Sequence, residues 1–164
     1  MKTLYLIGGP MGVGKTSVCQ QLKKELPDSV FLDGDWCWDA DPFQVTEETK
    51  RMVQENICFL LNQFLRCSAY ENVIFCWVLD RQAVIDEICL ALDLKDCTVR
   101  SVSLLAGAAQ LRARLEADVA AGKRTADVVG RSLARLPLYP ALHTIQIDTD
   151  GKSVRAVARE IMAL

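Results

Sequence analysis

Residues 9–16 read GPMGVGKT and match the pattern G-x-x-x-x-G-K-[ST] at every fixed position. The glycines of such a loop let successive backbone N–H groups turn inward and surround a phosphate group. The pattern brings the positive charge of Lys15 to the β- and γ-phosphates and offers the hydroxyl of Thr16 to Mg²⁺. This stretch therefore predicts a phosphate-binding loop (P-loop) for a nucleoside triphosphate.

The segments on either side of the loop follow in the required order. Residues 3–7 (TLYLI) form a short apolar run that is typical of a buried parallel strand. Residues 17–26 are amphipathic at helical spacing, and Pro27 ends that pattern. The dipole of the helix then adds to the anion site. The residues expected to bind the nucleotide are Gly9, Pro10, Met11, Gly12, Val13, Gly14, Lys15, Thr16 and Ser17.

The composition favours a single domain that spans residues 1–164, because hydrophobic residues make up 51% of the chain. A net charge of −2 gives no basic footprint for nucleic acid, and no apolar run is long enough for a membrane span. The first strand begins at once and leaves no room for a signal peptide. We therefore expect a cytoplasmic protein, monomeric or homodimeric, that binds a small molecule but neither nucleic acid nor membrane.

The cysteine content points to the same compartment. The chain has seven cysteines and one histidine, and no two cysteines form a CxxC pair. A zinc cluster is therefore not expected, and we interpret the cysteines as reduced, mostly buried thiols.

Strand and helix patterns alternate along the rest of the chain. Further strands are predicted at residues 29–32, 72–79, 98–105 and 143–147, and helices near 46–69, 82–92, 107–121 and after 153. Thr46 and Ser153 are expected to cap the helices that they precede. Five strands separated by helices predict a three-layer α/β fold, with a parallel sheet covered by helices on both faces.

An acidic pair, Asp33 and Asp35, follows directly after the second predicted strand in the segment 31–38 (FLDGDWCW). Ligands of an open parallel sheet bind beyond the carboxyl ends of its strands, so this pair and the P-loop share one edge. Asp33 is then expected to support Mg²⁺, through water, and Asp35 to orient or deprotonate an acceptor hydroxyl. The alternative is an ordinary Asp-Gly turn, but the preceding P-loop unit favours the functional interpretation.

With both motifs in place, the chain resembles the small-molecule kinases of the nucleoside-monophosphate-kinase-like fold. Gluconate and adenylylsulfate kinases share the Asp-Gly-Asp placement, and shikimate kinase has a similar Asp-x-Asp. Chloramphenicol phosphotransferase and tunicamycin-resistance-type proteins are similar in length and layout. The layout covers nearly the whole chain, whereas the exact motifs cover only residues 9–16 and 33–35.

This resemblance implies the P-loop nucleoside triphosphate hydrolase fold, with sheet order 2-3-1-4-5. It implies ATP and Mg²⁺ as ligands and transfer of the γ-phosphate to a hydroxyl of a small molecule. The resemblance does not identify the acceptor molecule. Gluconate is disfavoured, because Trp-Cys-Trp stands where gluconate kinases have His-Pro. A nucleoside or nucleotide kinase and a non-catalytic ATP-binding resistance-type protein are the alternatives.

The resemblance also places a helical lid at residues 115–137. Arg114, in the segment LRARL, is similar to the arginine that opens such lids, and Arg124 and Arg131 follow it. All three are implied to stabilise the transferring phosphoryl group, with a place beside the adenine ring as the alternative for Arg114. A helical lid would align Arg124, Arg131 and Arg135 on one face. Asp118 departs from related lids, which carry a second arginine there.

The acceptor is expected to bind within residues 35–70. Trp36, Trp38 and Phe43 cluster there and are interpreted either as an aromatic pocket wall or as core packing. Arg51 and Arg81 are the candidate partners for an acceptor carboxylate. Asp80 ends an apolar strand and is expected to cap the following helix rather than to bind metal. His143 is interpreted as structural.

Overall fold

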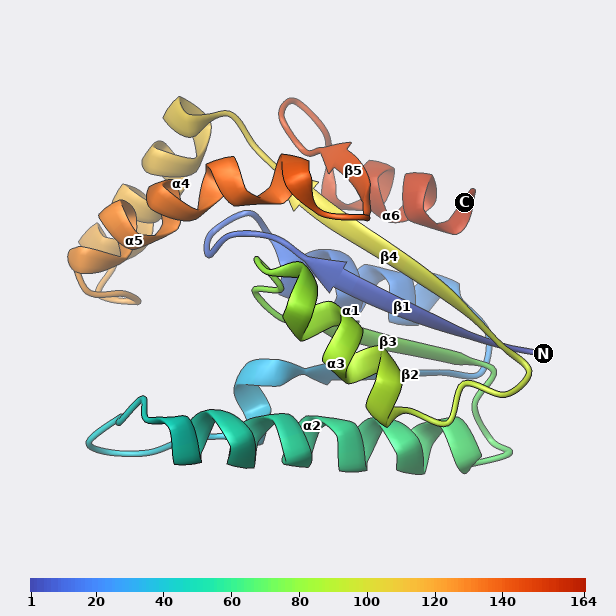
Figure 1. Ribbon diagram of the computed structural model, residues 1–164. Helices are drawn as coiled ribbons and strands as arrows, with labels where there is room; N and C mark the ends of the chain where they lie inside the picture. The colour runs from blue at the N-terminus through green and yellow to red at the C-terminus, as the bar shows by residue number, and fades with distance from the viewer.

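The computed structural model describes residues 1–164 and has three layers, with a parallel sheet in the middle (Figure 1). The sheet has five strands in the order β2-β3-β1-β4-β5, which confirms the predicted fold class and strand order. The strands are β1 (Lys2–Gly8), β2 (Ser29–Asp33), β3 (Asn72–Cys76), β4 (Cys97–Leu105) and β5 (Ile145–Asp148).

Helices follow the strands and cover both faces of the sheet (Figure 1). They are α1 (Lys15–Glu25), α2 (Glu47–Arg66), α3 (Gln82–Ala91), α4 (Ala108–Ala120), α5 (Asp127–Arg135) and α6 (Val154–Met162), with short 3₁₀ helices η1 (Gly34–Cys37) and η2 (Leu136–Ala141). The expected caps are present, since Thr46 Oγ1 accepts from Thr49 N and Ser153 Oγ accepts from Ala156 N. No helix is both long and apolar enough to cross a membrane.

The central strand β1 supplies side chains to both halves of the core. Tyr5 and Ile7 pack with the apolar residues of α1, α4 and α6, whereas Leu4 and Leu6 pack with those of α2 and α3. This alternation follows from the strand period of two, and burial of both faces explains why the run is continuously apolar. The carboxyl end of β1 is thereby fixed at the centre of one sheet edge.

The third strand is shorter than predicted. It ends at Cys76 rather than at residue 79, because Leu79 has a φ of 41°, which an extended strand does not allow. The carbonyl of Val78 accepts from Gly9 N at 3.2 Å and from the hydroxyl of the buried Tyr139 at 2.7 Å. Residues 77–80 therefore leave the sheet and run beside the P-loop.

The cysteines are all free, but fewer are buried than the sequence suggested. Cys19, Cys58 and Cys76 are buried, whereas the other four are half-buried at the edges of the helices and the sheet. The expectation of mostly buried thiols is therefore wrong, because apolar neighbours in sequence do not guarantee a position in the core.

Replacement of Gly9 by alanine should destabilise the fold. Gly9 has a φ of 147°, and a Cβ there would lie 2.7 Å from the backbone oxygen of Leu104. We expect Gly9→Ala to lower the free energy of unfolding by about 1–3 kcal/mol in urea titrations. The control Gly130→Ala lies within α5 with no heavy atom within 4 Å of the new methyl group. That change should stabilise by about 0.5–1 kcal/mol, and equal effects of the two changes would contradict the assignment.

Candidate active site

A cleft of about 900 Å³ opens at the carboxyl edge of the sheet. It lies between the helices α4 and α5 on one side and the segment that leads into α2 on the other (Figure 1). Its walls come from the P-loop, η1, residues 38–54, residues 77–84 and the two helices above. The cleft therefore occupies the position at which open parallel sheets bind their ligands.

The P-loop forms the floor of this cleft. Its glycines have left-handed or related backbone conformations, with φ of 84° at Gly12 and 103° at Gly14. Most of the predicted nucleotide-binding residues line the cleft, namely Met11, Gly12, Gly14, Lys15, Thr16 and Ser17. Gly9, Pro10 and Val13 do not line it; the Val13 side chain is instead packed into the core. These three residues therefore belong to the part of the loop that does not face the cleft.

Lys15 is folded over the loop from the first turn of α1. Its Nζ donates to the carbonyl oxygen of Pro10 at 3.0 Å and lies in the cleft. Burial lowers the pKa of Lys15, and the negative charges of Asp35 and Asp33 oppose that effect. A lysine in such surroundings is partly desolvated, which strengthens its attraction for an incoming phosphate group.

Thr16 and the acidic pair form a connected network at the centre of the cleft. The Thr16 hydroxyl donates to Asp33 Oδ2 at 2.8 Å, and Asp33 Oδ1 accepts from the backbone N–H of Asp35 at 3.0 Å. Asp33 is only 6% exposed, whereas Asp35 is exposed and lines the cleft. The structure thus brings the two predicted metal-binding oxygens together and leaves the Asp35 carboxylate facing open space.

The predicted lid consists of two helices joined by a turn, rather than one helix. Gly122 adopts a φ of 72° after the end of α4, and α5 begins only at Asp127. Arg124 lies in that turn, so the expected alignment of Arg124 with Arg131 and Arg135 on one helical face is wrong. All three arginines nevertheless line the cleft.

Two of these arginines are paired with acids of the lid itself. Arg124 Nε lies 3.2 Å from Asp118 Oδ2, and Arg131 Nε lies 2.9 Å from Asp127 Oδ2. Both pairs are substantially exposed and therefore weak.

Arg114 differs from the other predicted arginines because it does not line the cleft. Its Nη1 donates to the carbonyl oxygen of Val13 at 3.3 Å and to Thr149 Oγ1 at 3.5 Å. The side chain thus lies behind the P-loop, between α4 and the segment after β5. The contact of Arg114 with the transferring phosphoryl group, or alternatively with the adenine ring, stays a prediction.

The sequence of residues 6–132 matches the family model described as an AAA domain. The chain belongs to this AAA domain family. None of the curated proteins matches it. The match covers the P-loop, the acidic pair and most of the lid, so all the predicted site residues fall within the family region.

Several solved structures are similar to this AAA domain protein over nearly its full length. The tunicamycin resistance protein of Deinococcus radiodurans has a TM-score of 0.76 and 24% identity, over 99% of this chain and 95% of that one. A gluconokinase from Sinorhizobium meliloti 1021 has a TM-score of 0.70 and 17% identity, over 98% and 90%. The Mycobacterium tuberculosis APS kinase in complex with AMPPNP and APS has a TM-score of 0.65 and 14% identity, over 99% and 95%. These likenesses show the P-loop kinase-like fold.

Sequence reasoning missed the contacts that attach the lid of this AAA domain to the rest of the site. Asp80 was expected to cap α3, but α3 has no side-chain cap, and Asp80 Oδ2 instead lies 3.0 Å from Arg135 Nη1 on α5. Ser132, also on α5, is fully buried and donates to the carbonyl oxygen of Met11 at 2.6 Å. No local pattern signals these contacts, because the partners are 55 and 121 residues apart.

Trp77 was also missed, since it was expected within the third strand. It lines the cleft, and a Cβ on Gly34 would lie 2.6 Å from Trp77 Cγ. The glycine between Asp33 and Asp35 therefore makes room for this indole ring. Trp38 and Phe43 line the cleft as well, as the pocket-wall interpretation expects. Trp36, the third aromatic residue of the predicted cluster, does not line it. Of the predicted acceptor region 35–70, only residues as far as Gln54 reach the cleft.

Loss of the Asp80–Arg135 pair should loosen the lid. The Asp80 and Arg135 side chains are 15% and 34% exposed, so the pair is better shielded than the lid's other pairs. We expect Asp80→Asn to lower the free energy of unfolding by about 1 kcal/mol in urea titrations. The control Arg112→Gln breaks an exposed pair with Glu116 on the same lid and should leave the unfolding midpoint unchanged. Identical midpoints for Asp80→Asn and the unmodified protein would refute the role of this pair.

Proposed function

We propose that this protein is an ATP-dependent kinase that transfers the γ-phosphate of ATP to a hydroxyl group of a small molecule. The observation that carries the proposal is the network in which the Thr16 hydroxyl bonds to Asp33 and Asp33 holds the backbone of Asp35. A site for phosphoryl transfer needs a metal-supporting carboxylate and an acceptor-orienting group beside the phosphate loop. This network supplies both within a single cleft.

The P-loop and Lys15 bind the triphosphate. Backbone N–H groups of the loop and of the first turn of α1 surround the phosphates, and the helix dipole adds to their attraction. Lys15 exchanges its bond to Pro10 for a contact with the β- and γ-phosphates. The exposed pairs of Arg124 and Arg131 open in favour of phosphate oxygens, to which arginine binds bidentately.

Thr16 and Asp33 fit a magnesium ion, because a hydroxyl and a carboxylate oxygen are hard ligands and already lie 2.8 Å apart. When bound, Mg²⁺ neutralises charge on the phosphate oxygens. Asp33 is fixed by its two hydrogen bonds, so its carboxylate keeps one orientation.

Asp35 acts on the acceptor. Its carboxylate has no hydrogen-bond partner within the protein, and its backbone is held by Asp33. In the transfer step, the acceptor oxygen forms a bond to the γ-phosphorus while the bond from that phosphorus to the β–γ bridging oxygen breaks. The hydroxyl proton passes to the Asp35 carboxylate, and ADP leaves. A protein that only sequesters a nucleotide or ligand has no need for such a free carboxylate, which favours a kinase over a binding protein.

Replacement of Asp35 separates transfer from nucleotide binding. Asp35→Asn keeps the size of the side chain but removes the proton acceptor, so we expect kcat to fall by about 10²- to 10⁴-fold. The affinity for ATP should stay the same, as measured by titration calorimetry. The control Asp39→Asn changes an exposed carboxylate outside the cleft and should retain full activity. Transfer at the normal rate by Asp35→Asn would exclude its assignment as the base.

Replacement of Asp33 should act through the metal. We expect Asp33→Asn to raise the Mg²⁺ concentration for half-maximal activity by about 10- to 100-fold, because a neutral amide supports a hydrated cation less well. Initial rates over a range of Mg²⁺ concentrations measure this shift. An unchanged Mg²⁺ requirement would contradict the proposed metal site.

A further inference from the structure

The acceptor side of the cleft has mainly aromatic and branched aliphatic walls. The rings of Trp38 and Phe43 stack with a centroid separation of 4.2 Å and an interplanar angle of 28°, so each ring covers one face of the other. Phe43 and Val45 are each 60% exposed although they line the cleft. Apolar side chains that stay exposed around a concave site are typical of a surface that a ligand covers. The apolar residues of this wall are Trp38, Phe43, Val45, Val53, Trp77 and Val84.

The polar side chains of α2 on this wall are Lys50 and Gln54, and a ligand binds them only by displacing an acid. Lys50 is paired with Glu47 at 2.8 Å, and Gln54 donates to Glu87 at 3.0 Å. A polyhydroxylated sugar brings many hydroxyl groups into such a pocket, and each one left without a partner costs about 1–3 kcal/mol. The wall therefore disfavours a sugar or sugar acid as the acceptor.

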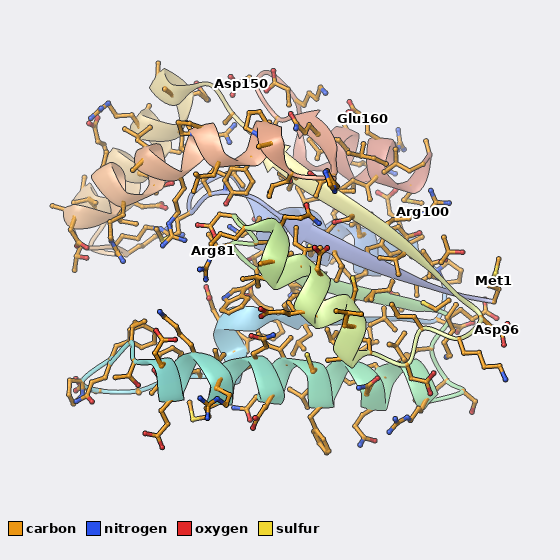
Figure 2. The ribbon with its side chains drawn as sticks, in the orientation of Figure 1. Met1, Arg81, Asp96, Arg100, Asp150 and Glu160 are labelled. Carbon is orange, nitrogen blue, oxygen red and sulfur yellow. The ribbon has the colours of Figure 1, made fainter.

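Arg81 is the exception to this apolar character. It lines the cleft from the start of α3, and its guanidinium group has neither an ion pair nor a hydrogen bond within the protein. Figure 2 shows the side chain extending from the start of α3 into the space between the lid and η1. The adjacent acid, Asp80, is bonded to Arg135, and the other acid near Arg81, Glu47, is bonded to Lys50. Arg51, the other cation considered from sequence, does not line the cleft.

We propose that the acceptor is an alcohol built on a planar apolar ring that carries one carboxylate group. The ring packs against the stacked Trp38–Phe43 pair, the hydroxyl meets Asp35, and the carboxylate meets Arg81. A single guanidinium fork matches the two oxygens and the single charge of a carboxylate. This inference rests on the proposed kinase function, because it assigns the acceptor of that same cleft.

The test compares four acceptors by ADP release: 4-(hydroxymethyl)benzoate, benzyl alcohol, gluconate and uridine. We expect kcat/KM for 4-(hydroxymethyl)benzoate to exceed that for each of the others at least about tenfold, which corresponds to one charge-assisted contact. Binding of the same compounds to the protein saturated with a non-hydrolysable ATP analogue is measured by calorimetry. A preference for gluconate or uridine would overturn the inference and leave the kinase function intact.

Two variants assign the preference to the proposed contacts. Arg81→Gln should raise KM for 4-(hydroxymethyl)benzoate about tenfold with a smaller effect on benzyl alcohol, whereas Trp38→Ala should raise KM for both aromatic alcohols. The control Arg51→Gln removes an exposed charge outside the cleft and should change neither value. Equal loss for both alcohols in Arg81→Gln would refute the carboxylate contact.

The two readouts separate the inference from the function on which it rests. Binding of 4-(hydroxymethyl)benzoate that Arg81→Gln weakens, without ADP release from any acceptor, would support the pocket assignment and overturn the kinase function. Neither binding nor ADP release with any of the four compounds would overturn the inference.

Discussion

The hydrogen bond from the Thr16 hydroxyl to the buried Asp33 carboxylate is the contact on which the site depends. It joins the first turn of α1 to the end of β2, the edge strand beside β3. An isolated carboxylate that is only 6% exposed would be costly, but this hydrogen bond and that from the Asp35 backbone satisfy both oxygens. The second of these bonds holds the backbone of Asp35, so the carboxylates proposed to support the metal and to face the acceptor are positioned together.

The P-loop is held from behind by the lid as well as by the sheet. Arg114 bonds to the carbonyl oxygen of Val13 and Ser132 to that of Met11, so both helices of the lid contact the loop backbone directly. Both carbonyl oxygens thus have hydrogen-bond partners within the protein. The lid is therefore joined to the loop backbone by two hydrogen bonds, one from each of its helices.

The sequence predicted the parts of this structure that short-range patterns encode. Alternation of apolar strands and amphipathic helices was enough for the fold class, and the P-loop and Asp33–Asp35 spacing placed the centre of the cleft. The errors arose where distant residues decide the local structure. The backbone leaves the extended conformation at Leu79, where the preceding carbonyl, that of Val78, accepts from Gly9 N and from the hydroxyl of the distant Tyr139. Asp80 leaves α3 uncapped because its partner, Arg135, lies on α5.

Asp118 shows how a departure from the resembled lids is accommodated in this chain. An acid replaces the second arginine of α4, which would seem to weaken the cationic face over the cleft. The structure pairs this acid with Arg124, at 3.2 Å, and both side chains line the cleft. Arg124 lies in a turn rather than a helix, so its orientation needs a partner, and Asp118 provides one without burying the charge. The acid therefore holds Arg124 at the wall of the cleft. Under the proposed function, the negative charge of a bound triphosphate would compete with Asp118 for that arginine.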